Sequence, residues 1–215
     1  MNYKKLINLY SMEESHYQQQ ITGVILAGGR AVRMGGQDKG LIEINGRKMI
    51  EYVIDVLRPQ VSTLLINANR HQMEYAHLGE CMVVADNYGN YEGPLAGMLS
   101  GLHNAQTEYV LFVPCDSPLI TPNLAERLYT GLQTAQADIS VATSPDGKLQ
   151  PVFALIKRQL LTALRQFLAD GERKIDRWYQ SQAMTVVDFA DSPDTFLNIN
   201  TPAEQAAIVE RLQAS

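Results

Sequence analysis

The stretch ITGVILAGGRAVRMGGQDKG, residues 21–40, joins a short apolar run to a glycine-rich loop that carries cations. The run 21–27 is rich in β-branched side chains, which is typical of a buried strand. Six of the fifteen glycines fall between Gly23 and Gly40, with Arg33 and Lys39 among them. Bare backbone amides after a strand, next to fixed cations, favour a phosphate cradle. From the loop alone, a mobile segment with solvated cations remains an alternative.

The loop matches neither of two familiar phosphate-binding motifs. A P-loop requires Ser or Thr after its lysine, whereas Gly40 follows Lys39. The dinucleotide pattern GxGxxG is also absent from it. Arg33 nevertheless offers a planar fork for phosphate oxygens, and Lys39 offers a compact charge. The residues predict phosphate binding in a loop of another kind.

Strand-like and helix-like segments alternate along the rest of the chain. The predicted strands cover 21–27, 63–69, 81–86, 109–116, 137–143, 150–156, 183–189 and 195–200. The predicted helices cover 47–57, 94–105, 121–132, 157–171 and 201–212. This alternation predicts a Rossmann-like three-layer α/β/α fold with a mostly parallel central sheet. We expect one domain over residues 21–215, preceded by a polar extension over residues 1–20.

Composition narrows the possible classes of protein. Hydrophobic residues make up 46% of the 215 residues and charged residues 19%, which fits a globular chain with a sizeable core. The net charge of −5 argues against a nucleic-acid binder. Cys81 and Cys115 have no zinc or redox spacing. No window suggests a secretory signal or a membrane span, so we expect a cytoplasmic protein that binds neither nucleic acid nor membrane.

Polar residues stand where the predicted strands end. In open α/β sheets, ligands bind beyond the carboxyl ends of the strands. The residues at these ends are Gly28, Gly29, Asn67, Asn69, Asp86, Asp116, Asn198 and Asn200. Each Asn or Asp alone could simply favour a turn. Agreement among five strand ends makes a binding site the better interpretation.

Several of these motifs together resemble one enzyme family. The loop LAGGRAVRMGGQDKG is similar to the signature of nucleotidyltransferases with the nucleotide-diphospho-sugar transferase fold. INANRHQ (66–72), GPLAGMLSGL (93–102), FVPCDSP (112–118) and FLNINTPAE (196–204) resemble, in order, motifs of the molybdenum cofactor guanylyltransferase (MobA) family. The resemblance covers about residues 21–212, with a less constrained stretch at 120–195.

The resemblance implies an activity and its site residues. The family transfers GMP from GTP to molybdenum-molybdopterin, releasing pyrophosphate and forming the molybdopterin guanine dinucleotide cofactor. Arg33, Lys39 and Asp116 would be catalytic, with Asp116 holding Mg²⁺, and Asn198 and Asn200 would face the pterin or complete the metal site. The implied GTP-binding residues are Leu26, Ala27, Gly28, Gly29, Lys39, Asn67, Asp86, Gly93, Pro94, Leu95 and Asp116.

Two other functions remain open at this point. One is a related nucleotidyltransferase that uses CTP or a sugar-phosphate acceptor, and the other is a non-catalytic nucleotide-binding regulator. Asp116 itself could merely cap the turn into SPLITP. The expected partners are GTP and molybdenum-molybdopterin, the latter delivered by or passed to other proteins of the cofactor pathway.

Overall fold

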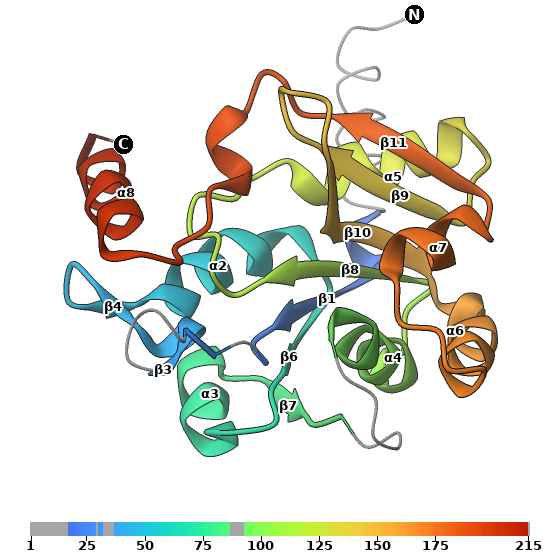
Figure 1. Cartoon of the computed structure of the whole chain (residues 1–215), viewed down its shortest axis with the longest axis horizontal. Coiled ribbons are helices and arrows are strands. Elements are labelled where there is room, and N and C mark those ends of the chain that lie inside the picture. Colours follow the sequence, from blue (N-terminus) through green and yellow to red (C-terminus); the bar gives the residue numbers. More distant parts are fainter. Residues whose placement is uncertain (1–16, 29, 32–36, 87–92, 215) are drawn as a thin grey trace, which may run out of the picture.

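The central element of the fold is a seven-stranded sheet, seen in Figure 1. The computed structural model describes residues 17–28, 30–31, 37–86 and 93–214. The strands are ordered β11 (Met184–Asp188), β9 (Ile139–Thr143), β10 (Leu149–Lys157), β8 (Tyr109–Pro114), β1 (Ile21–Leu26), β6 (Thr63–Asn67) and β7 (Met82–Val84). Only β10 runs antiparallel to its neighbours, which confirms the predicted mostly parallel sheet.

Helices cover both faces of this sheet. One face packs on α2 (Met49–Leu57), α3 (Gln72–Gly79) and α5 (Leu124–Thr134), and the other on α4 (Pro94–Asn104), α6 (Leu161–Ala169) and α7 (Ile175–Gln180). Strand β1 serves both layers, because Ile21 and Ile25 join the first core cluster and Val24 joins the second. The predicted three-layer α/β/α fold is therefore confirmed. None of the helices in the described ranges is long and apolar enough to cross a membrane.

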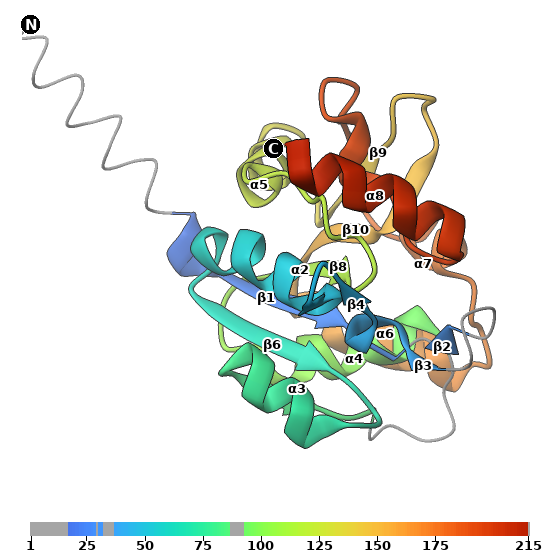
Figure 2. The same ribbon diagram turned by 90° about the vertical axis from the view of Figure 1, so that its left-hand side faces the viewer.

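A smaller cluster holds the C-terminal helix beside the glycine-rich loop. The hairpin of β4 (Glu43–Ile44) and β5 (Arg47–Lys48) contributes Ile44, and α8 (Pro202–Ala214) contributes Ile208. Gln205 Nε2 also donates to the backbone oxygen of Glu43 at 2.8 Å. Figure 2 shows α8 beside β4. The C-terminal segment thereby returns to the edge of the sheet where β1 ends.

The structure differs from the sequence predictions at several elements. Residues 195–200 form no strand, because the chain makes a 3-10 turn over Pro193–Phe196. It then runs to the loop after β8 that contains Asp116, here called the Asp116 loop. There the Ile199 backbone amide donates to the Asp116 carbonyl at 3.1 Å. Helix α5 begins at Leu124 after Asn123, three residues beyond the predicted start. Helices α3 and α7 were not predicted, because they are short and α3 buries only Tyr75 and Gly79.

The predicted N-terminal extension is only partly described. Residues 1–16 lie outside the described residues, while Gln18–Gln20 form a 3-10 turn ahead of β1. Tyr17 packs against the first core cluster, and its ring centroid lies 5.8 Å from that of Tyr129. The packed part of the chain therefore begins before Ile21, and the boundary at residue 20 stays a prediction.

Candidate active site

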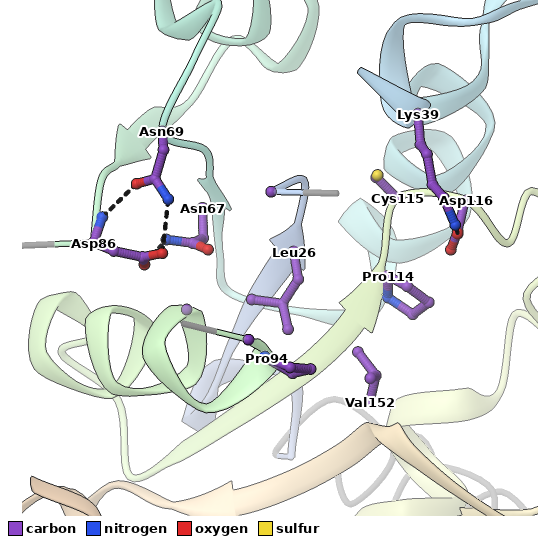
Figure 3. Close-up of a pocket in the computed structure, with 13 residues that line it drawn as sticks. Leu26, Lys39, Asn67, Asn69, Asp86, Pro94, Pro114, Cys115, Asp116 and Val152 are labelled. Atoms are coloured by element: carbon purple, nitrogen blue, oxygen red, sulfur yellow. Dashed lines mark hydrogen bonds and ion pairs between the residues drawn. The ribbon is translucent and has the colours of Figure 1, made fainter. Parts of the chain in front are cut away.

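A pocket of about 410 Å³ opens at the carboxyl ends of β1, β6 and β8 (Figure 3). Because these three strands are parallel neighbours, the residues that follow them meet at one edge of the sheet. The pocket is lined by Leu26, Gly28, Lys39, Asn67, Asn69, Asp86, Gly93, Pro94, Gly97, Pro114, Cys115, Asp116 and Val152. Its polar groups lie on two opposite walls, one around Asp86 and the other around Asp116.

On the first wall, neutral donors surround the carboxylate of Asp86. Asn67 Nδ2 donates to Oδ1 and Asn69 Nδ2 to Oδ2, each at 2.8 Å. The hydroxyl of Ser100 donates to Oδ1 at 3.1 Å, and the Asp86 backbone amide donates to Asn69 Oδ1 at 2.8 Å. These bonds fix the side chain without a cation. The wall thus presents an oriented, negatively charged acceptor to the pocket.

On the second wall, Asp116 is paired with Lys39. Lys39 Nζ lies 2.7 Å from Asp116 Oδ2 and 2.5 Å from Asn200 Oδ1. The side chains of Lys39 and Asp116 are only 20% and 10% exposed, so water screens the pair less than it would at the surface. Three elements thus meet here: the turn after β3 (Gln37–Asp38), the end of β8, and the C-terminal segment.

The C-terminal segment is bonded to the Asp116 loop by side chains as well as by backbone. Ser117 Oγ donates to Asn198 Oδ1 at 2.5 Å. The backbone amide of Asn200 donates to Glu204 Oε2 at 2.8 Å, which fixes the start of α8. Asn198 thus braces the loop, while Asn200 reaches the Lys39–Asp116 pair. Asn198 and Asn200, which were predicted to lie at this edge of the sheet, are therefore near the site although they belong to no strand.

Gly97 allows α4 to lie close to the ends of β1 and β6. A Cβ atom at position 97 would stand 2.4 Å from Asn67 Oδ1 and 2.9 Å from Leu26 Cδ2. Both distances are too short for real contacts. The absence of a side chain at Gly97 therefore sets the position of Asn67, and through it that of the Asp86 wall.

Cys115 borders the pocket but is unsuited to nucleophilic chemistry. Its side chain is buried, and burial followed by the charge of Asp116 raises the pKa of the thiol well above its ordinary value. The thiolate, not the thiol, is the nucleophile. Cys115 is therefore neutral near pH 7 and acts as a small packing residue.

Most of the predicted site residues come together in this pocket. Those that line it are Leu26, Gly28, Lys39, Asn67, Asp86, Gly93, Pro94 and Asp116. Ala27 and Leu95 do not line it, because their side chains are buried in the core at 2% and 1% exposure. Gly29 and Arg33 lie outside the described residues.

Asn69, expected at the ligand edge with the other strand ends, also lines the pocket, whereas sequence reasoning gave no role to four lining residues. They are Gly97, Pro114, Cys115 and Val152. Gly97, Pro114 and Cys115 stand inside motifs quoted above, so their segments were already expected near the site. Val152 gave no such signal, because it lies where the register of β10 shifts between Gln150 and Ala154.

The second wall also suits a magnesium ion. No cluster of three or more His, Cys, Asp or Glu side chains that could hold a metal occurs among the described residues. Mg²⁺, however, usually takes one or two carboxylates and completes its shell with water and substrate phosphates. The oxygens of Asp116 and Asn200 already converge on one cation, the Lys39 ammonium. This donor set fits a magnesium ion shared with a phosphate ligand.

Comparisons with known proteins agree with this geometry. The sequence profile of the MobA-like NTP transferase domain matches residues 23–185. A molybdenum cofactor guanylyltransferase from Shewanella sediminis is 47% identical over 194 residues, which is 90% of this chain and 97% of that protein. One from Shewanella woodyi is 46% identical over the same shares of the two chains.

Solved structures share the fold at lower identity. Molybdopterin-guanine dinucleotide biosynthesis protein A from Archaeoglobus fulgidus superposes with a TM-score of 0.76 at 21% identity, covering 90% of this chain and all of that one. A 4-diphosphocytidyl-2C-methyl-D-erythritol synthase from Anaerococcus prevotii superposes with a TM-score of 0.69 at 15% identity. The match covers 91% of this chain and 99% of that one. The profile match and the identity over nearly the whole chain show that this protein belongs to the MobA-like NTP transferase family, among the molybdenum cofactor guanylyltransferases.

Proposed function

We propose that the pocket binds GTP and that the chain transfers its GMP unit to the phosphate of molybdenum-molybdopterin. The acceptor phosphate oxygen forms a bond to the α-phosphorus of GTP. The bond from that phosphorus to the oxygen bridging to the β-phosphate breaks, and pyrophosphate leaves. The observation that carries this proposal is the pairing of Lys39 with Asp116 opposite an amide-held Asp86, within one pocket at the strand ends.

The Asp86 wall is the proposed guanosine side. Guanine carries donor groups at N1 and N2, and a carboxylate held by neutral amides is an acceptor that matches them. Adenine and cytosine present their donors and acceptors differently along the same edge. We therefore assign nucleotide selection to Asp86, with Asn67 and Asn69 fixing its orientation, and Gly93 and Pro94 bordering the ribose.

The Asp116 wall is the proposed phosphate side. Lys39 supplies positive charge to the triphosphate and to the leaving pyrophosphate, and the resemblance of the loop assigns Arg33 the same role. Asp116, with Asn200, would hold Mg²⁺, which would neutralise charge on the phosphates. No protein nucleophile is required, because the acceptor phosphate is ionised at neutral pH. Catalysis is then positioning and electrostatic stabilisation.

The pterin is proposed to enter beside the C-terminal segment. Asn198 and Asn200 lie next to the phosphate side, where the acceptor has to approach the α-phosphorus. We propose that other proteins of the cofactor pathway deliver the pterin or receive the product. A cytoplasmic location stays a prediction.

A nucleotide panel tests this proposal. The purified protein is incubated with molybdenum-molybdopterin, Mg²⁺ and GTP, CTP or ATP in separate reactions, and pyrophosphate and the dinucleotide product are measured. We expect GTP to react well ahead of the other two. Equal or faster turnover with CTP would support the cytidylyl alternative, and GTP binding without pyrophosphate release would support the regulatory one.

A further inference from the structure

Asp38 is a deeply buried carboxylate that lies outside the candidate active site. Its side chain is only 2% exposed, and it does not line the candidate active-site pocket. A carboxylate in such a place is costly unless it is paired and hydrogen-bonded. Arg70 Nη2 donates to Asp38 Oδ1, and His71 Nε2 lies 3.7 Å from Asp38 Oδ2. The chain thus maintains an ion pair between a buried carboxylate and a partly exposed arginine directly beside Lys39.

This ion pair joins two segments that border the site. Asp38 ends β3, whose partner strand β2 (Arg30–Ala31) lies at the other end of the glycine-rich loop, with Arg30 opposite Asp38 in register. Arg70 follows the end of β6, close after Asn69 of the Asp86 wall. The Asp38–Arg70 pair therefore ties the end of the loop to the sheet edge.

The pair also anchors the residue that precedes Lys39. Asp38 has an extended backbone, with φ −68° and ψ 128°, and the 3-10 turn Lys39–Leu41 follows it directly. The Asp38 carboxylate is bonded to Arg70, whereas the ammonium of Lys39 meets Asp116 and Asn200. Holding Asp38 in place therefore fixes the backbone from which the Lys39 side chain extends.

Close packing of the next residue restricts the turn further. A Cβ atom at Gly40 would lie 3.0 Å from Tyr75 Oη and 3.3 Å from Cys115 Cβ. The backbone after Lys39 is therefore seated closely against Tyr75 of α3 and against Cys115, the residue before Asp116. Lys39 is thus bounded by an ion pair before it and a tight contact after it.

We propose that Asp38 and Arg70 are positioning residues that act through Lys39, holding its ammonium at the phosphate side of the pocket. The inference rests on the proposed function of Lys39 and adds two residues to it that touch no substrate. It predicts that breaking the pair frees the lysine side chain. It also predicts that the catalytic effect of breaking the pair depends on the presence of Lys39.

The first experiment measures the freedom of Lys39 without using activity. Wild type and Asp38→Asn are labelled briefly with an amine-reactive ester, and peptide mass spectrometry gives the labelling of Lys39 relative to Lys157. Lys157 is a matched internal reference, because it is 23% exposed and pairs with Asp138 at 2.9 Å. We expect the Lys39 to Lys157 ratio to rise several-fold in Asp38→Asn and to stay unchanged in Asp191→Asn, which alters a remote ion pair with Arg127.

The second experiment is a double-mutant cycle on GTP-dependent pyrophosphate release. Asp38→Asn alone should lower kcat about 10–100-fold with a smaller change in the KM for GTP, by the size of effect expected from misplacing a catalytic group. In a Lys39→Ala background the same change should lower kcat less than about threefold, because its target is gone. Arg70→Lys, which keeps the charge, should retain most of the activity.

The outcomes separate this inference from the proposed function. A labelling ratio that does not change in Asp38→Asn overturns the positioning role, whatever the transfer assay gives. Equal fold-losses from Asp38→Asn with and without Lys39 also overturn it, since they would indicate a general structural effect. A wild-type chain that releases no pyrophosphate from GTP rejects the proposed function, and the labelling ratio still decides the positioning of Lys39.

Discussion

The Nζ atom of Lys39 lies 2.7 Å from a carboxylate oxygen of Asp116, although 77 positions separate the two residues in the chain. The two residues are proposed to bind different ligands: Lys39 the triphosphate and Asp116 the magnesium ion. Without these ligands the two charges neutralise each other in a mostly buried place. Binding of Mg²⁺ and GTP would thus exchange one set of charge pairs for another at that wall.

This pairing changes what is expected of Lys39→Ala. From the sequence, the lysine should matter for transfer and little for stability. With Asp116 only 10% exposed, removing its cation should cost about 1–3 kcal/mol of unfolding free energy. Millimolar Mg²⁺ should restore part of that loss by binding Asp116, so the Tm of Lys39→Ala should rise with Mg²⁺ more than that of wild type. Calorimetry with Lys157→Ala as the matched control checks this, and a Tm insensitive to Mg²⁺ in Lys39→Ala would argue against a metal at Asp116.

Gly97→Ala should disturb the Asp86 wall, which is the proposed guanosine side. The new Cβ would meet Asn67 Oδ1 at 2.4 Å, so Asn67 has to move and Asp86 loses a donor. We expect the affinity for GTP, measured by calorimetry, to fall about tenfold, which corresponds to roughly 1.4 kcal/mol. Gly131→Ala is the matched control, because its Cβ would also meet an atom at 2.4 Å, Val187 Cγ2, far from the pocket. Similar losses of GTP affinity in both variants would remove Gly97 from the binding argument.

Asp86→Asn tests nucleotide selection. The amide keeps the shape of the side chain but replaces one acceptor oxygen with a donor, which then faces the amides of Asn67 and Asn69. We expect kcat/KM for GTP to fall about 10–100-fold, in line with the 1–3 kcal/mol that a bidentate base contact provides. The KM for the pterin should change little. Unchanged discrimination between GTP and ATP would mean that other residues read the base.

Alkaline pH should destabilise the fold in part through Tyr75. Burial raises the pKa of Tyr75 above its ordinary value, and it also raises the pKa values of Cys115 and Tyr179. The folded state therefore keeps protons that the unfolded state loses, so stability is complete below the unfolded pKa values and falls as pH rises above about 9–10.

Tyr75→Phe isolates one of these groups. Tyr75 Oη has no hydrogen-bond partner within the described part of the chain, so the variant removes a titrating group without breaking a bond there. Urea unfolding between pH 8 and 11 should show a decline shallower by up to about 1.4 kcal/mol per pH unit. Tyr179→Phe provides the contrast, because it also loses a hydrogen bond to the Pro151 carbonyl and should be less stable at pH 8. Identical pH slopes for wild type and Tyr75→Phe would contradict the assignment.

Much of the site could be predicted because it follows from strand order. Asn67, Asp86 and Asp116 stand at or just beyond the ends of parallel strands, and the apolar runs of the sequence place those ends within two residues. The glycine-rich loop indicated Lys39, and the resemblance to known motifs added Gly93; periodicity specifies neither position. Together these residues account for both walls of the pocket.

The remaining features depend on contacts between distant segments. The Asp38–Arg70 pair joins residues 32 positions apart, and nothing in the local sequence shows that Asp38 is buried. Asn200 was placed at the correct edge for a wrong reason, since residues 197–200 form no strand and are held there by the Asp116 loop. Val152 depends on an irregularity in β10 that the alternation of side chains does not reveal.

Turnover of Asp116→Asn tests the central claim most directly, namely that this carboxylate organises the metal and the phosphates for GMP transfer. The substitution preserves the shape of the side chain and leaves the Ile199 amide bond to the Asp116 carbonyl in place, so the fold should persist. We predict a loss of kcat on the order of 10²–10³ with molybdenum-molybdopterin and GTP, by analogy with removing one preorganised electrostatic group. The Tm should stay within a few degrees of wild type, and excess Mn²⁺ should restore part of the rate. Near-normal turnover in a folded Asp116→Asn would contradict the account and leave Asp116 as a cap for the turn that follows it.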